Sequence, residues 1–165
     1  MRTRIIYWIL VMAFQILVLN HLDFSAYVIP QVFIIVLITM SLGWSKIQQL
    51  GVGFGLGLVA DLFIGTPGMH ASACLWLVLL RMGILGTQDI KQQAASNLTY
   101  NAHTVGFTPF MSTAVILVLF YHLYVFWLQN IGALHFTNYL LTVVISSLLA
   151  LTIIGILEYL SFQRK

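Results

Sequence analysis

Residues 50–71 read LGVGFGLGLVADLFIGTPGMHA, and the fold is predicted outward from this stretch. An apolar run ends in GTPG at 65–68, where proline presets one backbone angle and glycine can adopt a positive φ. A second apolar run begins directly after this turn and continues to residue 85. The stretch therefore predicts two apolar helices joined by a tight hairpin.

The whole chain has the composition of a membrane protein. Of its 165 residues, 61% are hydrophobic and 7% are charged, and the mean hydropathy is +1.00. A soluble surface needs roughly 25–35% Lys, Arg, Glu and Asp, so this composition excludes a water-soluble domain. The apolar stretches are continuous and do not alternate with polar residues, so they predict helices and exclude the strands of a membrane barrel.

The number of apolar runs fits six membrane spans. Each span of the hydrocarbon core takes about 20 helical residues, so six use roughly 120 and leave about 45 for connections. We therefore expect an all-α integral membrane protein, with residues 1–165 forming a single six-transmembrane-helix bundle. The expected spans are residues 4–20, 27–44, 48–65, 69–86, 107–128 and 138–162, with a polar cytoplasmic loop at 87–106.

The distribution of basic residues predicts the orientation of this bundle. With the N-terminus in the cytoplasm, all seven Lys and Arg residues lie on one side, including Lys46 and Arg81. The three opposite links, around Asp23, Thr66 and Asn130, contain no Lys or Arg. Since chance alone would rarely place seven charges on one side of two, we expect a multi-pass protein with both termini in the cytoplasm.

Asp61 is the one ionisable residue predicted to lie well inside a span. A carboxylate in hydrocarbon costs about 3 kcal/mol on the translocon scale, so such a residue usually faces the bundle interior or water. We favour a structural hydrogen-bonding role, and the alternatives are a proton or ligand site and an interface with another protein. The other acid of interest, Glu158, is expected to be a solvated residue at the cytoplasmic boundary.

Four glycines precede Asp61 on the same predicted helix and form two stripes. Gly53 and Gly57 lead to Asp61 in steps of four, whereas Gly51 and Gly55 lie about 160° away around the helix. Small residues spaced by four let two helix backbones approach closely in lipid. We therefore expect this helix to be the central one, packed on two sides. A hinge or a ligand approach is the less favoured interpretation of the glycines.

The remaining residues provide no catalytic, cofactor-binding or metal-binding pattern. The five histidines form no i,i+4 pair with a flanking Glu, Cys74 has no second cysteine, and the common nucleophile motifs do not occur. The net charge of +3 comes without a basic cluster, so a nucleic-acid partner is not expected. His122 is interpreted as a hydrogen-bonded packing residue, and His70 as a polar neighbour of Asp61 at the same depth.

The segment 55–71 resembles the rod-shape-determining protein MreD family. In that family a glycine-rich span leads from an aspartate into a hairpin of the Thr-Pro-Gly type and then into a helix that begins Met-His-Ala or Gly-His-Ala. The likeness extends to the length of the chain, its basic ends and the Tyr121-His122-Leu123 stretch. The candidate structural or partner-binding residues are Gly53, Gly57, Asp61, Thr66, Pro67, Gly68, His70 and His122.

Membership of this family implies a non-catalytic scaffold of the bacterial cell-elongation machinery, located in the inner membrane and concerned with rod shape and peptidoglycan synthesis. The implied partner is the single-span scaffold protein MreC, and through it an MreB-like filament and a cell-wall glycosyltransferase and transpeptidase pair. At the level of fold the family is similar to the six-helix substrate-capture subunits of energy-coupling-factor vitamin transporters.

The main alternative follows from that second likeness. A small-molecule capture subunit would have an outward-opening pocket lined by convergent polar and aromatic groups. Asp61, Tyr121, His122 and Gln129 are the residues that such a pocket would use. The sequence leaves both interpretations open.

Overall fold

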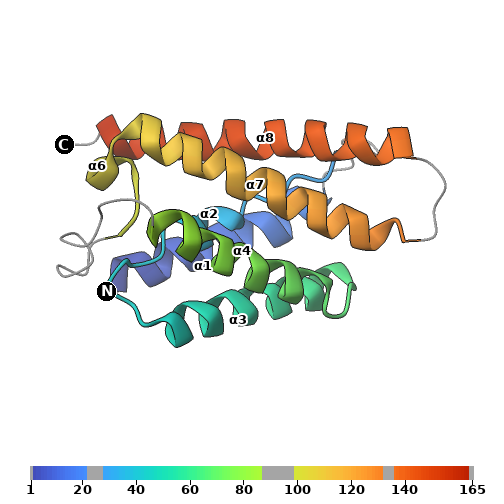
Figure 1. The fold of residues 1–165 in the computed structure, drawn as a ribbon, viewed down its shortest axis with the longest axis horizontal. Coiled ribbons are helices and arrows are strands. Elements are labelled where there is room, and N and C mark those ends of the chain that lie inside the picture. Colours follow the sequence, from blue (N-terminus) through green and yellow to red (C-terminus); the bar gives the residue numbers. More distant parts are fainter. Residues whose placement is uncertain (1, 22–27, 87–98, 132–135, 164–165) are drawn as a thin grey trace.

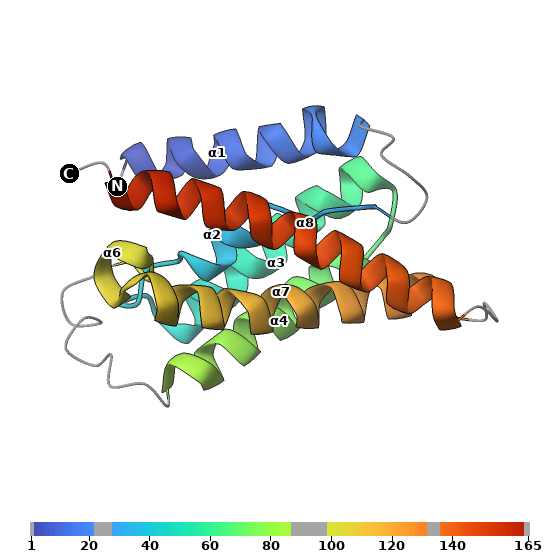
Figure 2. The same cartoon turned by 90° about the horizontal axis from the view of Figure 1, so that it is seen from above.

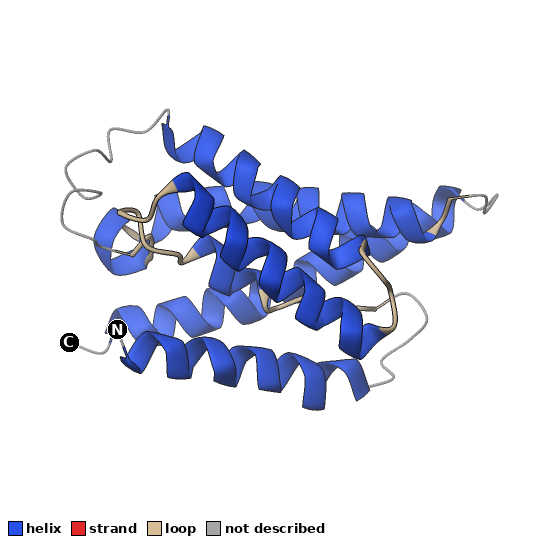
Figure 3. Ribbon diagram, turned by 90° about the horizontal axis from the view of Figure 1, so that it is seen from below, coloured by secondary structure: helices blue, strands red, loops and turns tan. Residues whose placement is uncertain are grey.

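The computed structural model describes residues 2–21, 28–86, 99–131 and 136–163 (Figure 1). Within these ranges the regular elements are helices, and one isolated bridge between Ser41 and Thr99 is the only β pairing (Figure 3). The predicted all-α class is therefore confirmed. The elements are α1 (Arg2–Leu17), the 3-10 turn η1 (Leu19–His21), α2 (Ile34–Ile38), α3 (Lys46–Ile64), α4 (Met69–Gly86), α6 (Ala102–Val105), α7 (Phe107–Gln129) and α8 (Phe136–Gln163).

Four of these helices are long and apolar enough to cross a membrane. They are α3, α4, α7 and the part of α8 between Thr137 and Ser161. They match the predicted spans 48–65, 69–86, 107–128 and 138–162 to within two residues at each end. The length and composition of these four helices are those of a membrane-embedded protein. The apolar helical stretch Ile6–His21, in the first predicted span, is shorter.

The prediction of a continuous helix over 27–44 is wrong. Only α2 is helical there, and the chain on both sides of it runs without regular structure. Four β-branched residues, which have low helix propensity, make up most of this five-residue helix. All residues from Val32 to Ile38 have no exposed surface, and α2 contacts α4 and α7. Non-helical backbone at membrane depth is tolerated only where protein covers it, and this segment meets that condition.

Side chains from three helices bind the backbone that precedes α2. Gln15 of α1 donates from Nε2 to the Pro30 carbonyl at 3.1 Å, and its Oε1 accepts from the Val32 amide at 2.7 Å. The amide of Gln31 donates to Nε2 of His122 in α7, and the amide of Ile29 donates to the Ser146 hydroxyl of α8. These bonds replace those that a continuous helix would have made within itself.

Arg81 of α4 binds the backbone at the other end of α2. Its Nε donates to the Ile38 carbonyl at 3.0 Å, and its Nη2 donates to the Met40 carbonyl at 2.8 Å. Its Nη1 donates to Oε1 of Gln49, whose own Nε2 donates to the Trp44 carbonyl. Expected only as a charge flanking the polar loop, Arg81 is instead 1% exposed and fixes the end of α2 against α3 and α4.

The spanning helices pack in chain order. The contacts run from α3 to α4, from α4 to α7 and from α7 to α8, and α4 also contacts α2. The expectation that the helix of residues 48–65 is central is therefore wrong, because α4 occupies that position and α3 packs chiefly against α4 alone. Figures 1 and 2 show this arrangement, with the α3–α4 pair beside the α7–α8 pair.

The ends of the long helices gather at two opposite ends of the molecule. The start of α1, the start of α3, α6 and the end of α8 lie at one end of the molecule, and the hairpin at 65–68 lies at the other (Figures 1 and 2). Lys46 begins α3, so it lies at the first of these ends. Most of the predicted cytoplasmic loop, residues 87–98, lies outside the described residues, and its remainder contains α6.

We expect Arg81→Met to lower the stability of the protein by about 3 kcal/mol or more, because two buried carbonyl groups and Gln49 lose their donor. Lys46→Met removes the same charge from an exposed position and serves as the control. The measurement is the apparent melting temperature in detergent, followed by size-exclusion chromatography after heating. Equal melting temperatures for the two variants would contradict this account of α2.

Candidate functional site

Asp61 lies at the junction of α3 and α4 and is 5% exposed. Its Oδ1 accepts from the Thr66 hydroxyl at 3.0 Å and from the His70 amide at 2.9 Å. Its Oδ2 accepts from the Ala71 amide at 2.9 Å. The carboxylate therefore binds orphan amides in the first turn of α4, where the helix dipole also favours a negative charge.

This geometry is the structural hydrogen-bonding role favoured from the sequence. Both oxygens are engaged by three donors of the chain itself, so the buried charge is compensated by protein groups. His70, the predicted polar neighbour, contacts Asp61 through its backbone amide, and its imidazole bonds to Tyr121 instead. Asp61 thus holds the first turn of α4 against the last turn of α3.

The turn between α3 and α4 has the geometry that its sequence predicts. Gly65 ends α3 in the left-handed conformation, with φ of 77°, and donates to the Asp61 carbonyl at 2.9 Å. Thr66-Pro67-Gly68-Met69 then forms a turn closed by a bond from the Met69 amide to the Thr66 carbonyl. Gly68 has φ of 83°, so proline and glycine occupy the positions of a type II turn.

Gly53 and Gly57 form the contact surface between α3 and α4. A methyl group at Gly57 would lie 2.6 Å from the His70 carbonyl oxygen and would overlap the backbone of Ala71. A methyl group at Gly53 would lie 2.8 Å from a methyl of Val78. Because the obstacle at Gly57 is backbone, it cannot move aside. This stripe therefore sets the distance between the two helices.

Gly51 and Gly55 behave differently. A methyl group at either position would meet no described atom within 4 Å. The prediction that α3 packs on two sides is therefore not met within the described part of the chain. The first glycine stripe is an internal contact, and the second lies on the outer surface of the bundle.

A line of aromatic and imidazole side chains joins α4 to α7. Nδ1 of His70 and the hydroxyl of Tyr121 share a hydrogen bond of 2.6 Å, and their rings are stacked with centroids 6.0 Å apart. Phe33, just before α2, packs edge-on against Tyr121 at 5.8 Å. His122, the next residue, donates from Nδ1 to the Val118 carbonyl at 2.9 Å. Together with its bond from the Gln31 amide, this makes His122 the hydrogen-bonded packing residue that was expected.

The structure therefore brings the hairpin residues Asp61, Thr66 and His70 into direct contact. His122 is joined to them only indirectly, through ring contacts with Tyr121. Gln129 is exposed at the end of α7. Among the described residues, no three His, Cys, Asp or Glu side chains gather as they would around a metal ion.

Glu158 departs from its prediction as a solvated end residue. It is 6% exposed, and its Oε2 accepts from the Ala102 amide at 3.2 Å, at the start of α6. The partner lies 56 residues earlier in the chain, so no local signal around Glu158 could have indicated it. A capping box between Asn101 and Thr104 begins α6 and positions this amide.

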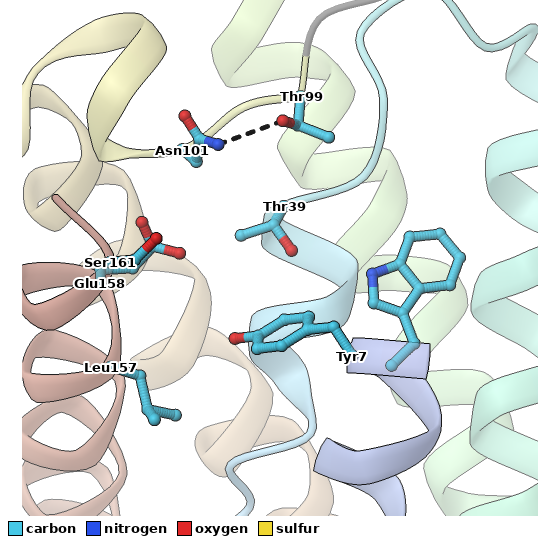
Figure 4. Close-up of a pocket in the computed structure, with 8 residues that line it drawn as sticks. Tyr7, Thr39, Thr99, Asn101, Leu157, Glu158 and Ser161 are labelled. Carbon is cyan, nitrogen blue, oxygen red and sulfur yellow. Dashed lines mark hydrogen bonds between the residues drawn. The ribbon is translucent and has the colours of Figure 1, made fainter. Parts of the chain in front are cut away.

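Glu158 also lines a pocket of about 300 Å³ between α1, the end of α2, the chain before α6, and α8 (Figure 4). A separate, apolar groove of about 500 Å³ lies between α1 and α3. The pocket is lined by Tyr7, Trp8, Thr39, Thr99, Asn101, Leu157, Glu158 and Ser161.

The chain matches no family model, no curated protein and no solved structure. The functional assignment therefore depends on the residues and the geometry described above.

Gly57→Ala should destabilise the protein by about 3 kcal/mol, because the added methyl group would force α4 away from α3. Gly55→Ala, two residues earlier on the same helix, should leave the stability unchanged or slightly higher, since the space there is open. The apparent melting temperatures of the two variants in one detergent measure this difference. A Gly57→Ala protein as stable as the parent would contradict the packing described for α3 and α4.

Asp61→Asn should cost about 2–3 kcal/mol, because the amide group of asparagine would face a backbone N–H that needs an acceptor. Thr66→Val removes only one of the three donors and should cost about 1 kcal/mol. Thermal unfolding of both variants tests whether Asp61→Asn loses more stability than Thr66→Val. If Asp61→Asn were as stable as the parent and yet inactive in the cell, the carboxylate would have a chemical role and not a structural one.

Proposed function

We propose that this protein is a non-catalytic membrane scaffold of the bacterial cell-elongation machinery, located in the inner membrane. The resemblance of residues 55–71 to the MreD family supports the choice of machinery. The partner is then an MreC-like single-span protein, which connects the scaffold to an MreB-like filament and to the cell-wall glycosyltransferase and transpeptidase pair. The observation on which the proposal depends is the unoccupied glycine stripe of α3.

The outer α3 face consists of Ile47, Gly51, Gly55, Leu58 and Leu62. These residues follow one another in steps of three or four, so they share one side of the helix. Ile47 is 82% exposed and Leu62 is 81% exposed, and the two glycines between them have open space above them. The face therefore has a shallow centre with bulky apolar residues at both ends.

A spanning helix fits this face better than lipid alone. Lipid tails are as apolar as leucine, so helix association in a membrane depends on close packing at small residues. α3 already uses one such stripe, Gly53 and Gly57, to pack against α4. The equivalent stripe on its outer face offers the same close approach to a helix from another chain. We therefore assign the outer α3 face to the single span of the partner.

The polar residues of the bundle support a scaffold more than an enzyme or a capture subunit. Both oxygens of Asp61 and both ring nitrogens of His122 are engaged with other groups of the chain. Tyr121 is bound to His70. Three of the four groups that an outward-opening capture pocket would use, Asp61, Tyr121 and His122, are thus occupied in bonds within the bundle, and the fourth, Gln129, is exposed at the end of α7.

We further propose that the chain crosses the membrane six times, with both termini in the cytoplasm. α1 with η1 supplies the first crossing, and the buried segment around α2 supplies the second. An extended residue advances about 3.3 Å, against 1.5 Å in a helix, so a partly extended segment needs fewer residues to cross. The start of α1 and the end of α8 lie at the same end of the molecule, as an even number of crossings requires (Figure 2).

The test is co-purification of the partner from a rod-shaped bacterium that produces the tagged protein. We expect the double variant Gly51→Leu, Gly55→Leu to recover at least tenfold less of the MreC-like protein, because leucine side chains would fill the shallow centre of the outer α3 face. Cells that depend on this variant should become round.

Gly83→Leu is the matched control, since Gly83 lies on α4 and also has no described atom within 4 Å of its added methyl group. All variants should have the melting temperature of the parent or a slightly higher one, since leucine has a higher helix propensity than glycine. Normal recovery of the partner by the double variant would refute the assignment of this face. A stoichiometric vitamin-like metabolite in native mass spectra, without a co-purifying protein, would favour the capture subunit.

A further inference from the structure

Glu158 is a buried carboxylate that the chain satisfies only in part. Its Oε2 accepts one hydrogen bond, from the Ala102 amide, and no described residue donates to its Oε1. Asp61, by contrast, has three donors shared between both oxygens. A carboxylate removed from water needs compensating donors or a positive charge. His103 of α6 acts on this carboxylate electrostatically, but no hydrogen bond from it or another described residue reaches Oε1, which therefore marks a place for a donating group.

The pocket beside Glu158 has room for such a group. Its volume is about 300 Å³, which is within the range of pockets for small ligands. Figure 4 shows the carboxylate of Glu158 from α8 and the hydroxyl of Tyr7 from α1 directed into the same space, with Thr39 between the two helices. Thr99, Asn101 and Ser161 add three more side-chain oxygens to the lining, and none of the described lining residues is Lys or Arg.

The aromatic residues of α1 favour the same class of ligand. Tyr7 and Trp8 both line the pocket, and an ammonium group is attracted to the faces of such rings as well as to a carboxylate. Trp44 packs edge-on against Trp8 with centroids 5.6 Å apart, which fixes the indole in place. A carboxylate, a phenol and an indole around one acceptor-rich space make a site suited to a primary ammonium group.

We propose that this pocket binds the primary ammonium of a phosphatidylethanolamine headgroup, with an acyl chain of the lipid in the apolar groove between α1 and α3. Trp8 lines both the polar pocket and the groove, so the two spaces adjoin at one side chain. The rest of the groove is apolar, as an acyl chain requires. The remaining groove residues are Ile9, Met12, Ala13, Ile16, Leu17, Leu56, Val59 and Phe63.

This arrangement also separates the lipid from the partner. Leu56, Val59 and Phe63 lie on the side of α3 that faces α1, whereas Gly51 and Gly55 lie on the outer α3 face. The lipid site can therefore be tested without the partner, and its failure would leave the scaffold proposal untouched.

The experiment measures which lipid stays with the full-length protein. The protein is purified in detergent, incubated with equal amounts of phosphatidylethanolamine and phosphatidylcholine of identical acyl chains, and analysed by native mass spectrometry. Choline has the same charge but no N–H donor for Oε1. We expect phosphatidylethanolamine to be retained roughly tenfold more, because charge-assisted hydrogen bonds are lost with choline.

Glu158→Gln should abolish this preference while keeping an oxygen that accepts from the Ala102 amide, so that α6 stays docked. Tyr7→Phe, which removes only a hydroxyl group, should reduce the preference less, and Tyr124→Phe on α7 should not change it. If Glu158→Gln does not fold, the lipid preferences of Tyr7→Phe and Tyr124→Phe are compared instead. A reduced preference in Tyr7→Phe alone supports the proposal.

Equal retention of the two lipids by the parent, or an undiminished preference in the variants of Glu158 and Tyr7, would overturn the proposal. A further arm adds glycerophosphoethanolamine, which has the headgroup without acyl chains. Continued retention of the lipid against an equal concentration of this soluble amine supports the lipid as ligand. Displacement of the lipid by it would overturn the assignment of the apolar groove.

Discussion

A backbone amide or carbonyl left unbonded in lipid costs several kcal/mol, and this constraint explains where the protein places its few polar side chains. The non-helical chain around α2 has many such groups. Gln15 and His122 bind them before α2, and Arg81 binds them after it. Asp61 and Glu158 do the same for the first amides of α4 and α6. These five buried side chains thus bind backbone groups that the helices themselves leave unbonded.

The same constraint separates the two buried acids. Asp61 has donors for both oxygens, so its site is complete and its removal is a matter of stability. Glu158 has one donor and an adjoining pocket, so its site is complete only with a further group. Burial alone would have treated the two carboxylates as equivalent. The number of donors around each one distinguishes an internal structural bond from a place where a ligand is expected.

The parts of the fold that could be predicted from the sequence are those set by residues close together in the chain. Hydrophobic runs of 18 residues or more gave α3, α4, α7 and α8, and the Thr-Pro-Gly turn gave their first hairpin. The segment around α2 is equally apolar. Hydropathy does not distinguish a segment surrounded by protein, as this one is, from a segment surrounded by lipid. Arg81 and Glu158 were misjudged because their partners lie 32 to 56 residues away in the chain. Donor and acceptor matches at that separation depend on packing, which composition does not encode.

The two glycine stripes of α3 share one sequence pattern but have different surroundings. Both stripes permit a close approach of backbones, but only Gly53 and Gly57 meet another helix within the described chain. Glycine lowers helix propensity, so a pair of glycines on a face without a neighbour destabilises the helix. Only the packing of a partner against that face would compensate for this loss. The edge position of α3 makes that face available, because its other side is already closed by α4. The helix that was expected at the centre of the bundle therefore lies at its edge, with one glycine stripe packed against α4 and the other open to the partner proposed above.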